Sequence, residues 1–232
     1  MEFKDKLISM LGKDWYEVLS EYLHSQSFLS IGKFIKNQRV KHTVYPESKL
    51  VFRAFRETGY YQTKVLMLGQ DPYFDGVTIA NGLAFCCGDS IKDSPSMQFI
   101  LKEIDLEYPD KQFDIGNGNL DRGNFTRLAH QGVLLLNKAL TVVKNKPKSH
   151  MKQWEDFTKK IVQTLDNKPG GVVFLLLGKD AQSVKPYIKN CSIVEAAHPA
   201  THAYRGEGFL GSEVFKKVNE ELKNLNKSEI HW

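Results

Sequence analysis

The stretch "LMLGQDPYFDG", residues 66–76, decides the fold. Its apolar run ends at Gly69, and a polar and aromatic cluster follows at once over residues 70–74. A short apolar run closed by glycine is typical of a strand that is buried on both faces. The cluster therefore lies where this strand leaves the sheet.

Three further apolar runs have the same form and predict strands over 132–137, 171–178 and, more weakly, 193–199. Amphipathic patterns separate them, including one over 151–166 and a last helix for which Ser212 is placed as the N-cap. Strands that alternate with helices predict an α/β fold with a parallel sheet. We expect a single domain with a central four-stranded parallel sheet flanked by helices.

The N-terminal part is expected to be helical. Residues 3–23 carry apolar side chains at helical spacing, interrupted near Gly12, which predicts two short helices. We expect the helices of residues 1–40 to precede an α/β core of about residues 45–222, with the whole chain of 1–232 forming one domain.

The composition narrows the class of protein. Of 232 residues, 41% are hydrophobic and 25% are charged, and the net charge of +5 suits a polyanion partner without requiring one. The cysteines Cys86, Cys87 and Cys191 form neither a disulfide framework nor a zinc-binding spacing. We expect a reducing, cytoplasmic setting, no metal, no signal peptide and no membrane span.

Polar side chains follow each predicted strand. Asp71 follows the first strand, Asn137 ends the second, Lys179 follows the third and His198 lies at the end of the fourth. Ligands of open α/β sheets bind at the carboxyl ends of the strands. The sequence therefore predicts a site at this edge of the sheet.

Each of these residues also has a structural interpretation. Asp71 before a proline is typical of a turn, although a carboxylate there can also act as a base or stabilise a cation. Asn137 either closes its strand or reads the edge of a base with its amide. His198 is either structural or an imidazole in a cleft.

The same two interpretations apply to the residues nearby. Tyr73 and Phe85 are either core residues or partners for stacking. Ser96 lies at a helix start, where Ser94 to Ser96 supply a cap and free N–H groups suit a phosphate. The basic stretch 144–148 is either a solvated loop or a contact to a phosphate backbone.

In combination and in this order, four blocks resemble the main family of uracil-DNA glycosylases. They are "GQDPY" (69–73), "NGLAF" (81–85), "LLLNKALTV" (134–142) and "HPATHAYRGEGFLGSEVFKKVNEEL" (198–222). The segment "VFLLLGKDAQ" (173–182) also fits, so the resemblance covers about residues 45–222. The family fold is one α/β domain with a four-stranded parallel sheet, in agreement with the strands expected above.

The resemblance implies a hydrolase that cleaves the bond between uracil and deoxyribose in single- or double-stranded DNA. The target nucleotide is flipped out of the helix, and the abasic site that remains initiates base excision repair. No metal or organic cofactor is required. The expected partner is uracil-containing DNA, the candidate protein partners are a glycosylase inhibitor and replication proteins, and the chain is expected to be a monomer.

The resemblance also implies roles for individual residues. Asp71 stabilises the sugar cation and positions the water. A neutral His198 donates a hydrogen bond to the uracil oxygen on which negative charge develops. Four residues are implied to bind uracil. Gln70 contributes its backbone N–H, and Tyr73 fills the space that a thymine methyl would need. Phe85 stacks on the flipped base, and the amide of Asn137 pairs with uracil O4 and N3–H. The implied contacts to phosphates and the minor groove are Ser96, Lys179, His202, Tyr204 and Arg205, with His202 or Tyr204 as the wedge.

The chain departs from the family pattern at several positions. Phe74 and Asn81 replace histidines, and Lys179 replaces a serine that contacts phosphate. The segment 200–203 reads Ala-Thr-His-Ala where the family usually has Ser-Pro-Leu-Ser. Two alternatives therefore stay open, namely a catalytically weakened DNA-binding or replication-accessory protein on the same fold, and a glycosylase for another damaged base.

Overall fold

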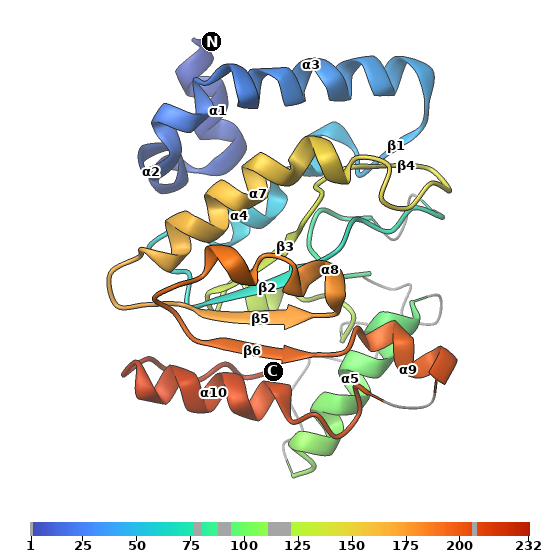
Figure 1. The fold of residues 1–232 in the computed structure, drawn as a ribbon, viewed down its shortest axis with the longest axis vertical. Helices are drawn as coiled ribbons and strands as arrows, with labels where there is room; N and C mark the ends of the chain where they lie inside the picture. The colour runs from blue at the N-terminus through green and yellow to red at the C-terminus, as the bar shows by residue number, and fades with distance from the viewer. Residues whose placement is uncertain (1, 77–79, 88–93, 111–121, 206–207) are drawn as a thin grey trace.

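The computed structural model describes residues 2–76, 80–87, 94–110, 122–205 and 208–232, with the backbone alone for 203–205. Figure 1 shows an α/β arrangement around one central sheet. The helices are α1 Phe3–Leu11, α2 Lys13–Leu23, α3 Gln26–Lys41, α4 Arg53–Glu57, α5 Pro95–Glu107, α6 Thr126–Ala129, α7 Met151–Asp166, α8 Lys179–Gln182, α9 Pro199–Arg205 and α10 Val214–Asn224, with 3-10 turns η1 Ser48–Leu50 and η4 Lys185–Tyr187. The strands are β1 Val44–Tyr45, β2 Val65–Gly69, β3 Val133–Asn137, β4 Val142–Val143, β5 Val173–Leu177 and β6 Ile193–Ala196.

The central sheet is four-stranded and parallel, as predicted. Its strand order is β3-β2-β5-β6. In the register of the sheet, Gly69 of β2 pairs with Asn137 of β3, and Leu68 of β2 pairs with Leu176 of β5. The strand order reverses beside β2, so the connections that leave β2 and β5 diverge and open a crevice at their carboxyl ends. The four predicted strands are confirmed, with ends that differ by up to three residues.

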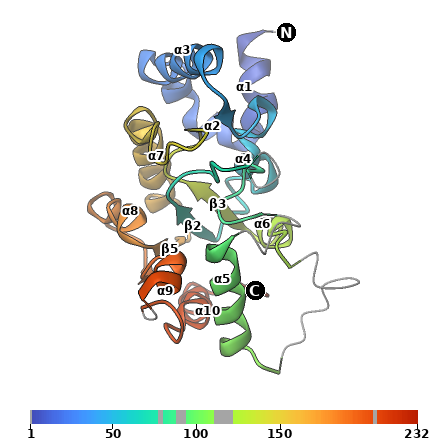
Figure 2. The same cartoon turned by 90° about the vertical axis from the view of Figure 1, so that its right-hand side faces the viewer.

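Helices cover both faces of this sheet. In Figure 1, α4 and α7 lie above it, with the N-terminal helices stacked beyond them, and α5 and α10 lie below it. Figure 2 and the packing of the elements agree that α5 and α9 lie side by side. The strands β2, β3 and β5 are buried on both faces, which explains their apolar sequences, whereas β6 at the edge is only partly buried.

The N-terminal helices are confirmed, including the break at Gly12, whose φ is 90°. Ser94 caps α5, because its side chain accepts a hydrogen bond from the N–H of Met97. The helix predicted over 151–166 has those bounds as α7.

The prediction that Ser212 caps the last helix is wrong. The hydroxyl of Ser212 contacts Oε1 of Glu103, and the first N–H groups at the start of α10 are satisfied by two carboxylates of α5. Glu103 accepts from the N–H of Glu213 at 2.8 Å, and Glu107 accepts from the N–H of Lys216 at 2.6 Å. Negative charge at a helix N-terminus is favourable, so the distant carboxylates take the place of the local cap.

A second, two-stranded sheet is absent from the sequence predictions. β1 pairs with β4 in antiparallel fashion, and the N–H of Lys144 continues the pairing by donating to the carbonyl of Thr43 at 2.9 Å. Two-residue strands leave no periodic pattern to detect. This pairing fixes where the basic loop 144–148 starts.

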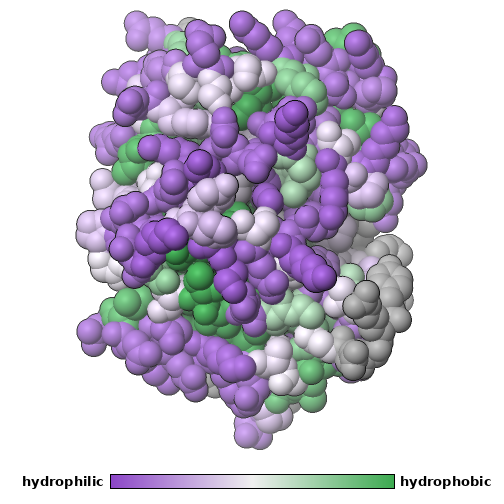
Figure 3. Space-filling view, in the orientation of Figure 1, coloured by the Kyte–Doolittle hydropathy of each residue, from purple (hydrophilic) through white to green (hydrophobic). Residues whose placement is uncertain are grey.

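Hydrophilic side chains cover most of the face seen in Figure 3, with smaller hydrophobic areas between them. Within the described part of the chain, no helix is long and apolar enough to cross a membrane. The described residues also contain no cluster of three or more His, Cys, Asp or Glu side chains that is placed to hold a metal ion.

Candidate active site

A cavity of about 160 Å³ opens at the carboxyl ends of β2 and β3. The structure brings together here seven residues that the sequence singles out, namely Gln70, Asp71, Tyr73, Phe85, Ser96, Asn137 and His198. Its remaining lining comes from Pro72, Phe74, Ala80, Asn81, Gly82 and Leu83. The convergence predicted from strand ends is observed for Asp71, Asn137 and His198, whereas Lys179 is not among the residues that line the cavity.

Asp71 is held by two hydrogen bonds. The side-chain amide of Gln70 donates to Oδ1 at 2.8 Å, and the backbone N–H of Lys148 donates to Oδ2 at 2.6 Å. Burial raises the pKa of Asp71, while these two bonds and the charge of Lys148 oppose the shift. The carboxylate is thus fixed in orientation by donors that favour its ionised form.

The sequence predicts neither of these contacts. It indicates a role for Gln70 only through its backbone, and the stretch that contains Lys148 is interpreted as a solvated loop or a phosphate contact. The loop is in fact tied to the site at a second point, because the N–H of Asn145 donates to the carbonyl of Phe74 at 3.0 Å. No sequence signal marks these contacts, because the loop follows β4, a strand of two residues that the sequence does not predict.

His198 lies directly after β6 and is largely enclosed. The N–H of Ala200 donates to Nδ1 of His198 at 3.2 Å. Because Nδ1 accepts a hydrogen bond, the proton of a neutral imidazole lies on Nε2. Burial lowers the pKa of His198, with partial opposition from Asp180, so the neutral form is favoured.

Glycine is required next to His198. A Cβ on Gly178 would lie 2.7 Å from Cβ of His198, and the φ of Gly178 is +88°. Both facts exclude a side chain at the end of β5. The ring of His198 faces Phe85, with 6.0 Å between the ring centroids.

Tyr73 and Phe85 form the aromatic part of the cavity. The hydroxyl of Tyr73 donates to the carbonyl of Phe85 at 3.1 Å and lies 2.5 Å from Oγ of Ser94. Burial raises the pKa of Tyr73, so its hydroxyl stays protonated. Phe85 has a φ of 63°, which is uncommon outside glycine and is maintained by its surroundings.

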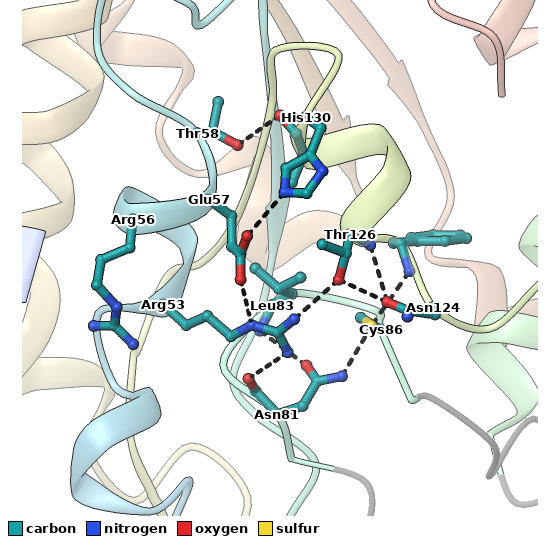
Figure 4. Close-up of polar contacts among 12 residues, drawn as sticks. Arg53, Arg56, Glu57, Thr58, Asn81, Leu83, Cys86, Asn124, Thr126 and His130 are labelled. Atoms are coloured by element: carbon teal, nitrogen blue, oxygen red, sulfur yellow. Dashed lines mark hydrogen bonds and ion pairs between the residues drawn. The ribbon is translucent and has the colours of Figure 1, made fainter. Parts of the chain in front are cut away.

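The segment that carries Phe85 is anchored by Asn81 and Arg53 (Figure 4). Asn81 donates to Sγ of Cys86 at 2.9 Å and accepts from the N–H of Leu83 at 3.1 Å. Arg53 of α4 donates to the carbonyl of Asn81 at 3.2 Å, and its Nε donates to Glu57 at 3.0 Å. Asn81, which stands in place of a family histidine, therefore has a structural role in this turn.

Asn137 lies beside the backbone of Gly69. A Cβ added at Gly69 would clash with Oδ1 of Asn137 and would lie 3.4 Å from the ring of Phe85. Glycine at this point lets the strand end approach the amide closely. The glycine that closes the first apolar run is thus part of the site as well as a strand terminator.

Replacement of Gly69 by alanine tests this close approach. The added methyl displaces the amide of Asn137, and we expect kcat/KM of the reaction at this site to fall about 10- to 100-fold, the usual cost of losing one bidentate hydrogen-bonded contact. Gly32→Ala in α3 is the matched control, because a Cβ there meets nothing within 4 Å. Steady-state kinetics should show unchanged activity for the control, and equal activity of both variants would contradict the inferred contact.

Of the predicted DNA-contacting residues that the structure describes, only Ser96 lines the cavity. Ser96 lines the cavity near the start of α5, and Lys179 is exposed as the first residue of α8. The ring of His202 lies against Phe99, with 5.0 Å between centroids. The side chains of Tyr204 and Arg205 lie outside the described part of the chain, and the wedge and phosphate roles of all five residues stay predictions.

Together these features define an α/β protein with a small pocket in which a carboxylate, an imidazole, an amide and two aromatic rings meet. A model of the uracil DNA glycosylase superfamily matches residues 55–223 of the chain. Two bacterial proteins named uracil-DNA glycosylase are similar over almost their whole length. The protein of Bacillus mycoides (strain KBAB4) is 37% identical over 97% of both chains, and that of Bacillus cereus (strain AH187) is also 37% identical over 97% of both.

Solved structures agree on the fold. Mimivirus uracil-DNA glycosylase matches with a TM-score of 0.79 at 21% identity, over 97% of this chain and 88% of that one. The wild-type UNG structure from Nitratifractor salsuginis matches with a TM-score of 0.64 at 16% identity, over 100% of both chains. The chain belongs to the uracil DNA glycosylase superfamily.

Proposed function

We propose that this chain is a uracil-DNA glycosylase, which hydrolyses the N-glycosidic bond of flipped-out deoxyuridine and leaves an abasic site in DNA. One observation carries the proposal, namely that Asp71, Asn137 and His198 meet in one cavity with Phe85 and Tyr73. The family membership of the chain supports the same activity. The product would enter base excision repair.

Base recognition would rest on Asn137 and the two aromatic rings. The amide of Asn137 offers one acceptor and two donors, which suit O4 and N3–H of uracil and oppose the reversed pattern of cytosine. Phe85 would stack on the ring. Tyr73, held by Ser94 and the carbonyl of Phe85, would occupy the space that a thymine methyl needs.

Bond cleavage would develop opposite charges on the two sides of the bond. The electron pair of the C1′–N1 bond moves to uracil, leaving an oxocarbenium-like sugar. Asp71 would stabilise this cation and accept the proton of the water that adds to C1′. His198 would donate its Nε2–H to the uracil oxygen on which negative charge grows, as donors of an oxyanion hole do.

The test is uracil release from single-stranded and duplex oligonucleotides that carry one uracil. We expect release of uracil, with none from matched oligonucleotides that carry thymine or cytosine at the same position. Intact DNA binding without release would contradict the proposal and favour the weakened DNA-binding protein. That alternative is not favoured, because such a protein has no chemical need for an oriented carboxylate and a neutral imidazole in one cavity.

The partners follow from the same proposal. Uracil-containing DNA is the substrate, and Lys179 and the side of the molecule around α9 are proposed to contact its phosphates. A mimivirus relative was solved in complex with UGI, so we propose that a protein inhibitor of this kind is a partner here as well. A monomeric state and a cytoplasmic location complete the proposal.

A further inference from the structure

One residue of the basic loop, Lys148, contacts Asp71 of the site with its backbone and Asp180 of α8 with its side chain. Its N–H donates to Oδ2 of Asp71 at 2.6 Å, and its Nζ forms an ion pair with Oδ2 of Asp180 at 2.8 Å. Asp71 and Asp180 follow different strands of the sheet, β2 and β5. Lys148 therefore joins the loop to the ends of both strands at the mouth of the cavity.

The backbone of Lys148 is in an unusual conformation. Its φ is 62°, in the left-handed region that residues with a Cβ seldom adopt. This conformation aims the N–H at Asp71 while the side chain extends toward α8. The contact with Asp180 is the interaction that holds the lysine side chain in this direction.

The ion pair also governs the charge around the two reacting groups. Asp180 acts on both of them, since its carboxylate raises the pKa of Asp71 and the pKa of His198. Lys148 acts in the opposite direction on Asp71. Among the described residues, the other charged and titratable groups on the surrounding elements are Tyr73 and Asp75 on the segment of Asp71, Lys138 after β3, Lys144 and Lys146 on the loop, Lys179 on α8 and His202 on α9.

We propose that Lys148 is a positioning residue for the catalytic carboxylate, which acts through its ion pair with Asp180. The pair anchors the N–H of Lys148 on Asp71 and offsets the negative charge of Asp180 at the reacting groups. This inference rests on the proposed function. It assigns Lys148 a role inside the site, whereas a role in DNA binding would place its ammonium on a phosphate.

The test is the pH dependence of uracil release under single-turnover conditions with a single-stranded substrate at saturating enzyme. Lys148→Met leaves Asp180 unpaired, so the pKa of Asp71 rises and the acid limb of the rate profile moves to higher pH, by about 0.5–1 unit for a partly exposed pair. Asp180→Asn should move the limb to lower pH. Because Lys148 then has no carboxylate to pair with, adding Lys148→Met to Asp180→Asn should move the limb less than the same change does in the wild type.

Two further variants serve as controls. Lys185→Met removes a comparable ion pair, because Lys185 and Glu195 are 2.8 Å apart with similar exposure, and neither is among the groups that shift the pKa of Asp71 or His198. Its acid limb should coincide with that of the wild type. Lys148→Arg keeps the charge and should restore the limb even if Lys148→Met lowers the stability of the fold.

The outcomes separate the possible roles of Lys148. An unchanged acid limb in Lys148→Met, with a KM for DNA that rises and depends less on salt, would mean that the lysine is a phosphate contact and would overturn the proposal. Equal shifts of the limb when Lys148→Met is made in the wild type and in Asp180→Asn would equally contradict action through the pair. Failure of the proposed function is distinguishable from both, because the wild type would then release no uracil at any pH.

Discussion

Asp71→Asn is expected to lower the rate of uracil release by about 10²–10⁴-fold, the usual contribution of a positioned acid–base group. The change removes the negative charge that would stabilise the sugar cation and accept the proton of water. It also disturbs the orientation of the side chain at position 71. The carboxylate accepts hydrogen bonds from two donors, Gln70 and Lys148, whereas the NH₂ group of an asparagine would face one of these donors. Single-turnover release from single-stranded DNA measures the loss.

The pH dependence of the rate gives a second test of the role of Asp71. Burial raises the pKa of Asp71, so the wild-type rate should fall as the pH drops through a value above the usual range of an aspartate. In Asp71→Asn this limb should disappear. DNA binding by fluorescence anisotropy and the melting temperature are the controls for folding, and release equal to that of the wild type would overturn the assignment of Asp71.

Much of this site is predictable from the sequence for a physical reason. A strand buried on both faces must be apolar throughout. The change from apolar to polar residues after Gly69, which leads to Asp71, therefore marks its end. The carboxyl ends of parallel strands meet at one edge, which brings Asp71, Asn137 and His198 together without knowledge of the strand order. The resemblance to a family then assigns a role to each residue.

The contacts that orient these residues are not predictable in the same way. The hydrogen bond from Lys148 to Asp71 spans 77 residues and depends on the pairing of β1 with β4, two strands of two residues each. The cap of α10 likewise comes from Glu103 of α5, across 110 residues, and not from the serine beside it. Local patterns identify elements, whereas these side chains find partners only once the elements are packed.

His198→Ala is expected to lower the rate about 10²–10³-fold, the usual cost of losing one donor to a developing oxyanion. The donor is inferred to be Nε2–H of a neutral imidazole, because Nδ1 accepts the N–H of Ala200 at 3.2 Å. His198→Gln is the matched variant, since its amide keeps a donor on a side chain of similar reach. We expect it to recover part of the loss.

The pH dependence distinguishes the neutral donor from a cationic one. Burial lowers the pKa of His198, which favours the neutral ring as the donor. His198→Ala should therefore lower the plateau of the rate profile without moving the acid limb that Asp71 sets. If the wild-type rate instead falls as the pH rises past about 6.5, the ordinary pKa of histidine, and this fall is absent in His198→Ala, the donor is the imidazolium. In that case Nδ1 carries a proton as well, and the contact with Ala200 must break when uracil is bound.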